Sequence, residues 1–126
     1  MHTLLIEPDA LQARTFITAL ERAGHTVAYT ASAQAAVHLA DEHRPDAVIL
    51  ELLLPSHNGV EFLYEFRSYP EWLHVRVLLH TFIPPQELSF AATLQGELGV
   101  RRILYKPATT LANLCEAVQR IAPAVL

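Results

Sequence analysis

Short apolar runs alternate along this chain with longer segments in which apolar residues recur every three or four positions. The apolar runs predict five strands, at residues 3–7, 26–30, 46–51, 75–81 and 101–105. The longer segments predict five helices, at residues 9–24, 32–43, 60–69, 85–98 and 109–122. Because this order repeats a strand–helix unit, we expect a parallel sheet with helices on both faces.

Residues at the predicted helix ends support this division of the chain. Asp9 and Gln12 have the spacing of a capping box, Ser32 stands where it can cap the second helix, and Gly24 can end the first. Pro85 is expected to open the fourth helix, where a missing N–H does no harm. The third predicted strand is apolar almost throughout, which predicts burial on both faces.

Composition narrows the class of protein. The chain has 126 residues, of which 52% are hydrophobic and 17% charged, so we expect one globular domain over residues 1–126. A formal net charge of −4, without runs of like charge, argues against direct binding to nucleic acid. No membrane span and no signal peptide is expected. The single cysteine, Cys115, is interpreted as a buried or half-buried packing residue, and a cytoplasmic location is expected.

Four polar residues stand at the ends of predicted strands: Glu7, Glu51, Thr81 and Lys106. In open α/β sheets, functional groups gather outside the carboxyl ends of the strands, so these side chains are expected to meet in one crevice. Two carboxylates, a hydroxyl and an amine suit a site that holds a phosphoryl group and a divalent cation.

The sequence motifs of nucleotide-binding loops, serine hydrolases and zinc sites are absent from the chain. The chain has no GxGxxG or Walker-type loop and no nucleophile elbow, and its seven histidines show no zinc-site spacing. No catalytic residue and no metal site are therefore assigned. An enzyme that uses Glu7 and Glu51 as an acid/base pair stays open as an alternative.

Four segments carry a resemblance to a known family: "LLIEPDALQAR", "RPDAVILELLLPSHNGVEFL", "VRVLLHT" and "YKPATTLANL". In this order they are similar to the acidic cluster, phosphoacceptor strand and loop, switch strand and Lys-Pro segment of response-regulator receiver domains. The chain thus resembles a receiver domain of two-component systems over nearly its whole length. The resemblance implies a flavodoxin-like, doubly wound α/β fold with five parallel strands in the order 2-1-3-4-5 and five helices.

Departures from the family pattern lie in the acidic cluster and at the acceptor. Receivers usually have two adjacent acids after the first strand, and the second of them binds magnesium. Here Glu7 is followed by Pro8, which offers no side-chain oxygen, and Asp9 is interpreted as a helix cap rather than a metal ligand. Glu51 stands where the family has its phosphoacceptor aspartate.

The switch region matches the family only in part. By resemblance, Thr81 is the switch hydroxyl and Lys106 the anion clamp. The small residue that usually follows the switch hydroxyl is replaced by Phe82, which is expected to block the crevice, and the switch aromatic is replaced by Ile103. The resemblance also implies a cis bond before Pro107.

Glu51 is expected to be a poor phosphoacceptor. Its extra methylene moves the carboxylate by about 1.5 Å, and misplacement by about 1 Å can cost about a hundredfold in rate. The longer side chain can instead reach Lys106 and form an ion pair. The resemblance therefore implies a pseudo-receiver, a phosphorylation-independent signalling module that is not an enzyme, has no cofactor and binds Mg²⁺ weakly or not at all.

We expect this module to act by protein–protein interaction, with a partner protein or as a homodimer. The predicted contact face is formed by the fourth helix, fifth strand and fifth helix, with Leu88, Phe90 and Leu94 inside a rim of Arg101, Arg102, Glu116 and Arg120. The alternative is an active phosphoacceptor receiver in a phosphorelay that controls transcription.

Overall fold

Five parallel strands form one sheet in the order β2-β1-β3-β4-β5. The computed structural model describes residues 1–55 and 58–121. The strands are β1 (His2–Ile6), β2 (Thr26–Thr30), β3 (Ala47–Leu50), β4 (Arg76–Thr81) and β5 (Val100–Tyr105). Their order and parallel pairing confirm the predicted topology.

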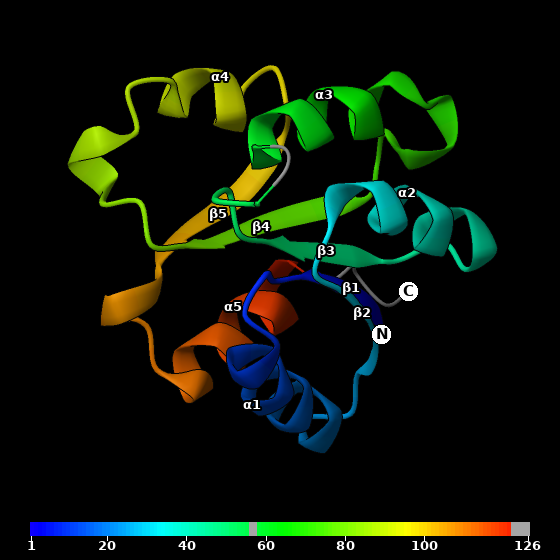
Figure 1. Ribbon diagram of the computed structural model, residues 1–126, viewed down its shortest axis with the longest axis vertical. Coiled ribbons are helices and arrows are strands. Elements are labelled where there is room, and N and C mark those ends of the chain that lie inside the picture. Colours follow the sequence, from blue (N-terminus) through cyan, green and yellow to red (C-terminus); the bar gives the residue numbers. More distant parts are fainter. Residues whose placement is uncertain (56–57, 122–126) are drawn as a thin grey trace.

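Helices cover both faces of this sheet. They are α1 (Ala10–Arg22), α2 (Ala33–Glu42), α3 (Gly59–Ser68), α4 (Ala91–Gln95) and α5 (Leu111–Ile121). Figure 1 shows α2, α3 and α4 on one face and α1 with α5 on the other. The doubly wound α/β class predicted from the sequence is therefore confirmed.

Each face of the sheet has its own hydrophobic cluster. On one side Phe66 stacks between Phe62 and Trp72, with ring centroids 5.3 and 4.9 Å away. On the other side Phe16 and Leu20 of α1 belong to one cluster with residues of α5. All four residues of β3 are buried, which agrees with the unbroken apolar run in its sequence.

The cap of α1 is built by two acids. The Asp9 carboxylate accepts hydrogen bonds from the N–H groups of Leu11 and Gln12, at 3.0 and 3.1 Å. The Asp9 N–H donates to Glu7 Oε2 at 3.0 Å, so Glu7 takes the place that Gln12 would have in a capping box. The start of α1 is thereby fixed to the acid that follows β1.

The predicted fourth helix, 85–98, is wrong in length. A 3-10 turn at Pro85–Glu87 is followed by a five-residue α4. Leu88, with ψ of 73°, breaks the helical path after the turn, and α4 stops at Gly96. Two successive prolines at 84 and 85 supply no N–H for a helical hydrogen bond, which favours a short turn there.

The predicted cis bond before Pro107 is also wrong, since the described residues contain no cis peptide bond. Lys106–Ala108 form a 3-10 turn in which the Thr109 N–H donates to the Lys106 carbonyl at 3.2 Å. Proline fits the first positions of such a turn because its fixed φ suits it and its missing N–H has no partner to lose. In the described ranges, no helix is long and apolar enough to cross a membrane.

Candidate functional site

The structure brings three of the four predicted strand-end side chains together. Glu7 and Glu51 each follow their strand by one residue, as does Lys106 after β5. The Lys106 ammonium lies 2.6 Å from Glu7 Oε1 and 3.1 Å from Glu51 Oε1. All three residues are at most 8% exposed. They form what we call the acid–lysine crevice.

Every carboxylate oxygen in this crevice has a donor. Glu51 Oε1 accepts the Phe82 N–H at 3.0 Å in addition to Lys106, and Glu51 Oε2 accepts the Leu53 N–H at 3.2 Å. Glu7 Oε1 is bound to Lys106 and Glu7 Oε2 to the Asp9 N–H. The buried acids are therefore matched to donors, which offsets much of the cost of removing them from water.

Thr81 and Phe82 both flank the crevice, but Thr81 is buried and Phe82 is partly exposed. Thr81 is fully buried at the end of β4, and its hydroxyl oxygen accepts the Ile83 N–H at 3.2 Å. The Phe82 ring lies over the Lys106 ammonium, 4.6 Å from the ring centroid, while 45% of the residue is exposed. Lys106 thus faces two carboxylates and one aromatic face.

Of the other residues singled out from the sequence, Asp9 contributes only its N–H to the crevice, and Pro8 and Ile103 make no hydrogen bond to it. Pro8 is half-buried and has no side-chain donor or acceptor, and Asp9 is occupied as a helix cap. Ile103 is half-buried and packs against the hydrophobic cluster on the α3 face. Over residues 1–55 and 58–121, no three His, Cys, Asp or Glu side chains are grouped so that they could hold a metal ion.

Sequence reasoning missed two residues next to the crevice. The Tyr29 hydroxyl donates to the Glu7 carbonyl at 2.8 Å, and burial, followed by the charges of Glu7 and Asp9, raises the pKa of Tyr29. His80 is buried with its ring edge against Phe16. The alternation of side chains along β4 was the available signal, since it puts His80 on the opposite sheet face from Thr81.

Burial is the main cause of a lowered pKa at His80. Burial and, to a smaller extent, the charge of Lys106 lower the pKa of His80 to about 4, against an opposing effect of Glu51. The imidazole is therefore neutral near pH 7. Its Nδ1 atom has no hydrogen-bond partner among the described residues.

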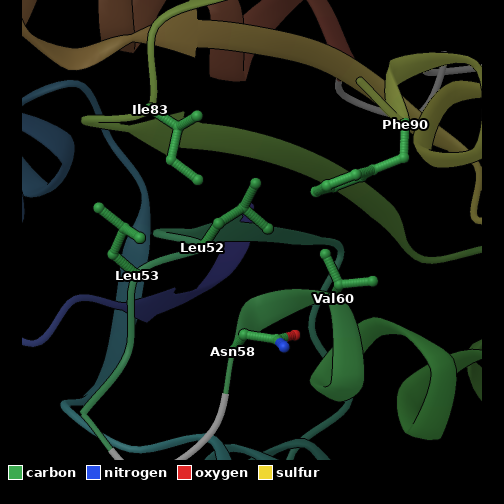
Figure 2. A pocket seen from close by; sticks show the side chains of 6 residues that line it. All are labelled: Leu52, Leu53, Asn58, Val60, Ile83 and Phe90. Atoms are coloured by element: carbon green, nitrogen blue, oxygen red, sulfur yellow. The ribbon is translucent and has the colours of Figure 1, made fainter. Parts of the chain in front are cut away.

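Figure 2 shows side chains from the loops after β3 and β4, from α3 and from the start of α4 around an apolar cleft, which has a volume of about 260 Å³. It is lined by Leu52, Leu53, Asn58, Val60, Ile83 and Phe90. One wall is tied to the crevice, because the Leu53 N–H donates to Glu51, and another is tied to the flanking Thr81, because the Ile83 N–H donates to its hydroxyl oxygen. Crevice and cleft are thus connected through the loops that follow β3 and β4.

Gly59 closes the loop that follows β3. Its N–H donates to the Leu52 carbonyl at 2.8 Å, and a Cβ at this position would lie 2.8 Å from the Leu52 Cα. Only glycine allows so close an approach. His57, one of the seven histidines without zinc-site spacing, falls outside the described residues.

The model of the response regulator receiver domain family matches residues 3–119. The chain belongs to this family. The polar-differentiation response regulator DivK of Brucella anthropi is 28% identical over 78 residues, which are 62% of this receiver and 63% of DivK. The virulence transcriptional regulatory protein PhoP of Salmonella choleraesuis is 35% identical over 78 residues, which are 62% of this receiver and 35% of PhoP. The matched part thus spans less than two thirds of either relative.

Solved structures share the fold over nearly the whole chain. The chemotaxis protein CheY4 of Vibrio cholerae is 21% identical, with a TM-score of 0.83 and coverage of 95% of this chain and 97% of CheY4. A CheY-like receiver domain from Methylobacillus flagellatus is 26% identical, with a TM-score of 0.81 and coverage of 96% and 98%. Receiver domains are signalling modules that interact with other proteins, and they are not classical enzymes.

The predicted contact face needs correction. Leu88 and Leu94 are only 6% and 0% exposed, because they pack into the core beside the short α4. Phe90 is 40% exposed and available. One groove between β5 and α5 is lined by Arg102, Glu116 and Arg120, of which Glu116 and Arg120 form an ion pair at 2.7 Å. Arg101 lines a separate cavity.

Cys115 of α5 is half-buried, and burial raises the pKa of its thiol.

Proposed function

We propose that this receiver is a pseudo-receiver, a phosphorylation-independent signalling module in which Glu51 stands in place of the phosphoacceptor aspartate. The observation that carries the proposal is the set of donors around Glu51. Its two oxygens accept the Leu53 N–H, the Phe82 N–H and the Lys106 ammonium. A phosphoryl group on a shorter acid would need donors of this kind from the same loops, and here the longer carboxylate occupies them.

The charge of the crevice supports the same proposal. Two buried carboxylates share one ammonium, so the group carries excess negative charge before any ligand arrives. A phosphoryl donor would meet that charge and no uncommitted lysine. A divalent cation would have to displace Lys106 without help from Pro8, so Mg²⁺ binding is proposed to be weak or lost.

The fixed crevice also suggests how the module signals. Because Glu51 holds the N–H groups of Leu53 and Phe82 without phosphorylation, the loops after β3 and β4 keep one arrangement. We propose that the contact surface lies on α4, β5 and α5, and that it includes the exposed Phe90 before α4 and the groove of Arg102, Glu116 and Arg120. Its occupant is a protein partner or a second copy of the chain.

Binding of beryllofluoride, an analogue of the phosphoryl group, tests this proposal directly. We expect fluorine NMR of the protein with beryllofluoride and Mg²⁺ to show no bound signal, and the amide signals of Leu53 and Phe82 to stay in place. The Arg102→Gln variant is a matched control for nonspecific fluoride effects, since it changes one exposed charge away from the crevice. A magnesium-dependent bound signal in the wild-type protein would instead support an active receiver in a phosphorelay, including one that controls transcription.

A further inference from the structure

A second polar cavity, of about 210 Å³, lies at the opposite end of the sheet from the acid–lysine crevice. It is found where β4 and β5 begin, whereas the crevice is found where the strands end. Its lining residues are Arg67, Leu73, His74, Val75, Arg76, Gly99 and Arg101. We call it the arginine cavity.

Arg67 is bound in this cavity by three backbone carbonyl groups. Its Nε donates to the Leu98 carbonyl at 2.9 Å, and its Nη1 donates to the carbonyls of Trp72 and Leu73 at 2.7 and 3.3 Å. Nη2 has no acceptor among the described residues. It lies 3.4 Å from the point where a Cβ on Gly99 would be, so this glycine, with φ of +65°, keeps the space beside it open.

The positive charge of the cavity is not neutralised by the described part of the chain. Arg101 lies near enough to lower the pKa of Arg67, although burial is the larger cause. None of the lining residues is acidic, and Arg67, Arg76 and Arg101 form no ion pair with a described residue. Like charges held together in this way cost free energy, and an anion would remove that cost.

We propose that the arginine cavity binds a small phosphate-bearing anion, held by the guanidinium groups of Arg67 and Arg101 with Arg76 and His74 at the wall. Guanidinium groups match phosphate oxygens in charge and in hydrogen-bond geometry. The volume lies below the range of about 300–1,000 Å³ typical of sites for larger ligands, so the cavity suits the phosphate group itself. The net charge of −4 is no obstacle, because attraction at this distance is local.

Titration with inorganic pyrophosphate, followed by calorimetry and by amide NMR, tests the inference. We expect shifts at His74, Gly99 and Arg101 and no shifts at Glu51. Arg101→Gln should weaken binding by about tenfold or more. Arg102→Gln is the matched control, because it removes the same charge from the next residue of β5, outside the cavity; it should change affinity by less than about twofold.

The inference is overturned by any of three results. One is the absence of saturable binding at about 10 mM pyrophosphate. Another is equal weakening by Arg101→Gln and Arg102→Gln, which would mean general attraction to surface charge. A third is a set of shifts centred on Glu51 and Phe82. Both substituted arginines are exposed, so urea unfolding of the two variants is expected to match the wild type and to show that each is folded.

Discussion

At the carboxyl end of the sheet, Lys106 is enclosed by two carboxylates and a phenyl ring, whereas at the amino end Arg67 lies beside Arg101 with no described acid against it. Lys106 is buried and paired with acids, whereas Arg67 is half-buried, Arg101 is exposed, and neither is paired with a described acid. In the crevice every carboxylate oxygen has a donor, which stabilises the crevice without a ligand, whereas the unpaired positive charge at the other end favours an anion. The comparison thus separates a site that we propose has lost its phosphorylation switch from one that we propose binds an anion.

Removing the crevice cation should have the largest effect. Lys106→Met leaves Glu7 and Glu51 buried without a counter-charge, so the free energy of unfolding should fall by about 3–5 kcal/mol. Urea unfolding at pH 7 measures this free energy. The Arg102→Gln variant is the control, and its free energy of unfolding should stay within about 0.5 kcal/mol of wild type. A loss below about 1 kcal/mol for Lys106→Met would show that the ion pairs do little to hold the fold.

Acid should destabilise the same region through His80. Its pKa is about 4 in the folded protein and 6.5 in the unfolded chain, so the unfolded chain alone gains the proton between these values. The contribution of His80 to stability is therefore full above pH 6.5 and is lost as pH falls towards 4, by about 3 kcal/mol in all. Urea unfolding across this window should show a flatter pH dependence for His80→Leu. Parallel curves for the two proteins would exclude this role.

The two ion pairs should differ in strength. Glu7→Gln and Glu51→Gln should each cost about 1–3 kcal/mol. Double-mutant cycles with Lys106→Met should show stronger coupling for Glu7, which lies 2.6 Å from the ammonium against 3.1 Å for Glu51. Strictly additive losses would mean that the acids and the lysine do not interact.

Removing a cation from the arginine cavity should have the smallest effect. Arg101→Gln relieves repulsion with Arg67 and breaks no described ion pair, so the free energy of unfolding should change by less than about 0.5 kcal/mol. Urea unfolding without added anions measures this change. If Arg101→Gln lowered the free energy of unfolding as much as Lys106→Met, the two ends of the sheet would not differ in the way described.

The pattern of apolar and polar residues predicted the sheet and the meeting of Glu7, Glu51 and Lys106. These follow from topology, since the carboxyl ends of neighbouring parallel strands must lie together. The pattern could not show that Lys106 lies closer to Glu7 than to Glu51, because side-chain conformation decides it. The resemblance to receivers directed attention to the ion pair of Lys106 with Glu51 and not to the one with Glu7.

Two further features could not be predicted for different reasons. The length of the fourth helix was overestimated because proline is common at the first position of a helix, so Pro85 indicated a helix start. The chain instead leaves the helical path at Leu88, whose side chain is buried in the core. The arginine cavity joins Arg67 at the end of α3 with residues where β4 and β5 begin, and in the sequence each arginine resembles an ordinary surface charge. Only tertiary packing brings them together.

Labelling with acetyl phosphate tests most directly the claim that this receiver has lost phosphorylation. Three defects are proposed, so Glu51→Asp alone should stay unlabelled, and the combination with Pro8→Asp and Phe82→Ala should restore the acceptor length, the metal ligand and the space for the phosphoryl group. We predict magnesium-dependent label at position 51 in the triple variant, after its folding is verified, and none in the wild-type protein. Label on the wild type at a rate like that of the triple variant would contradict the account.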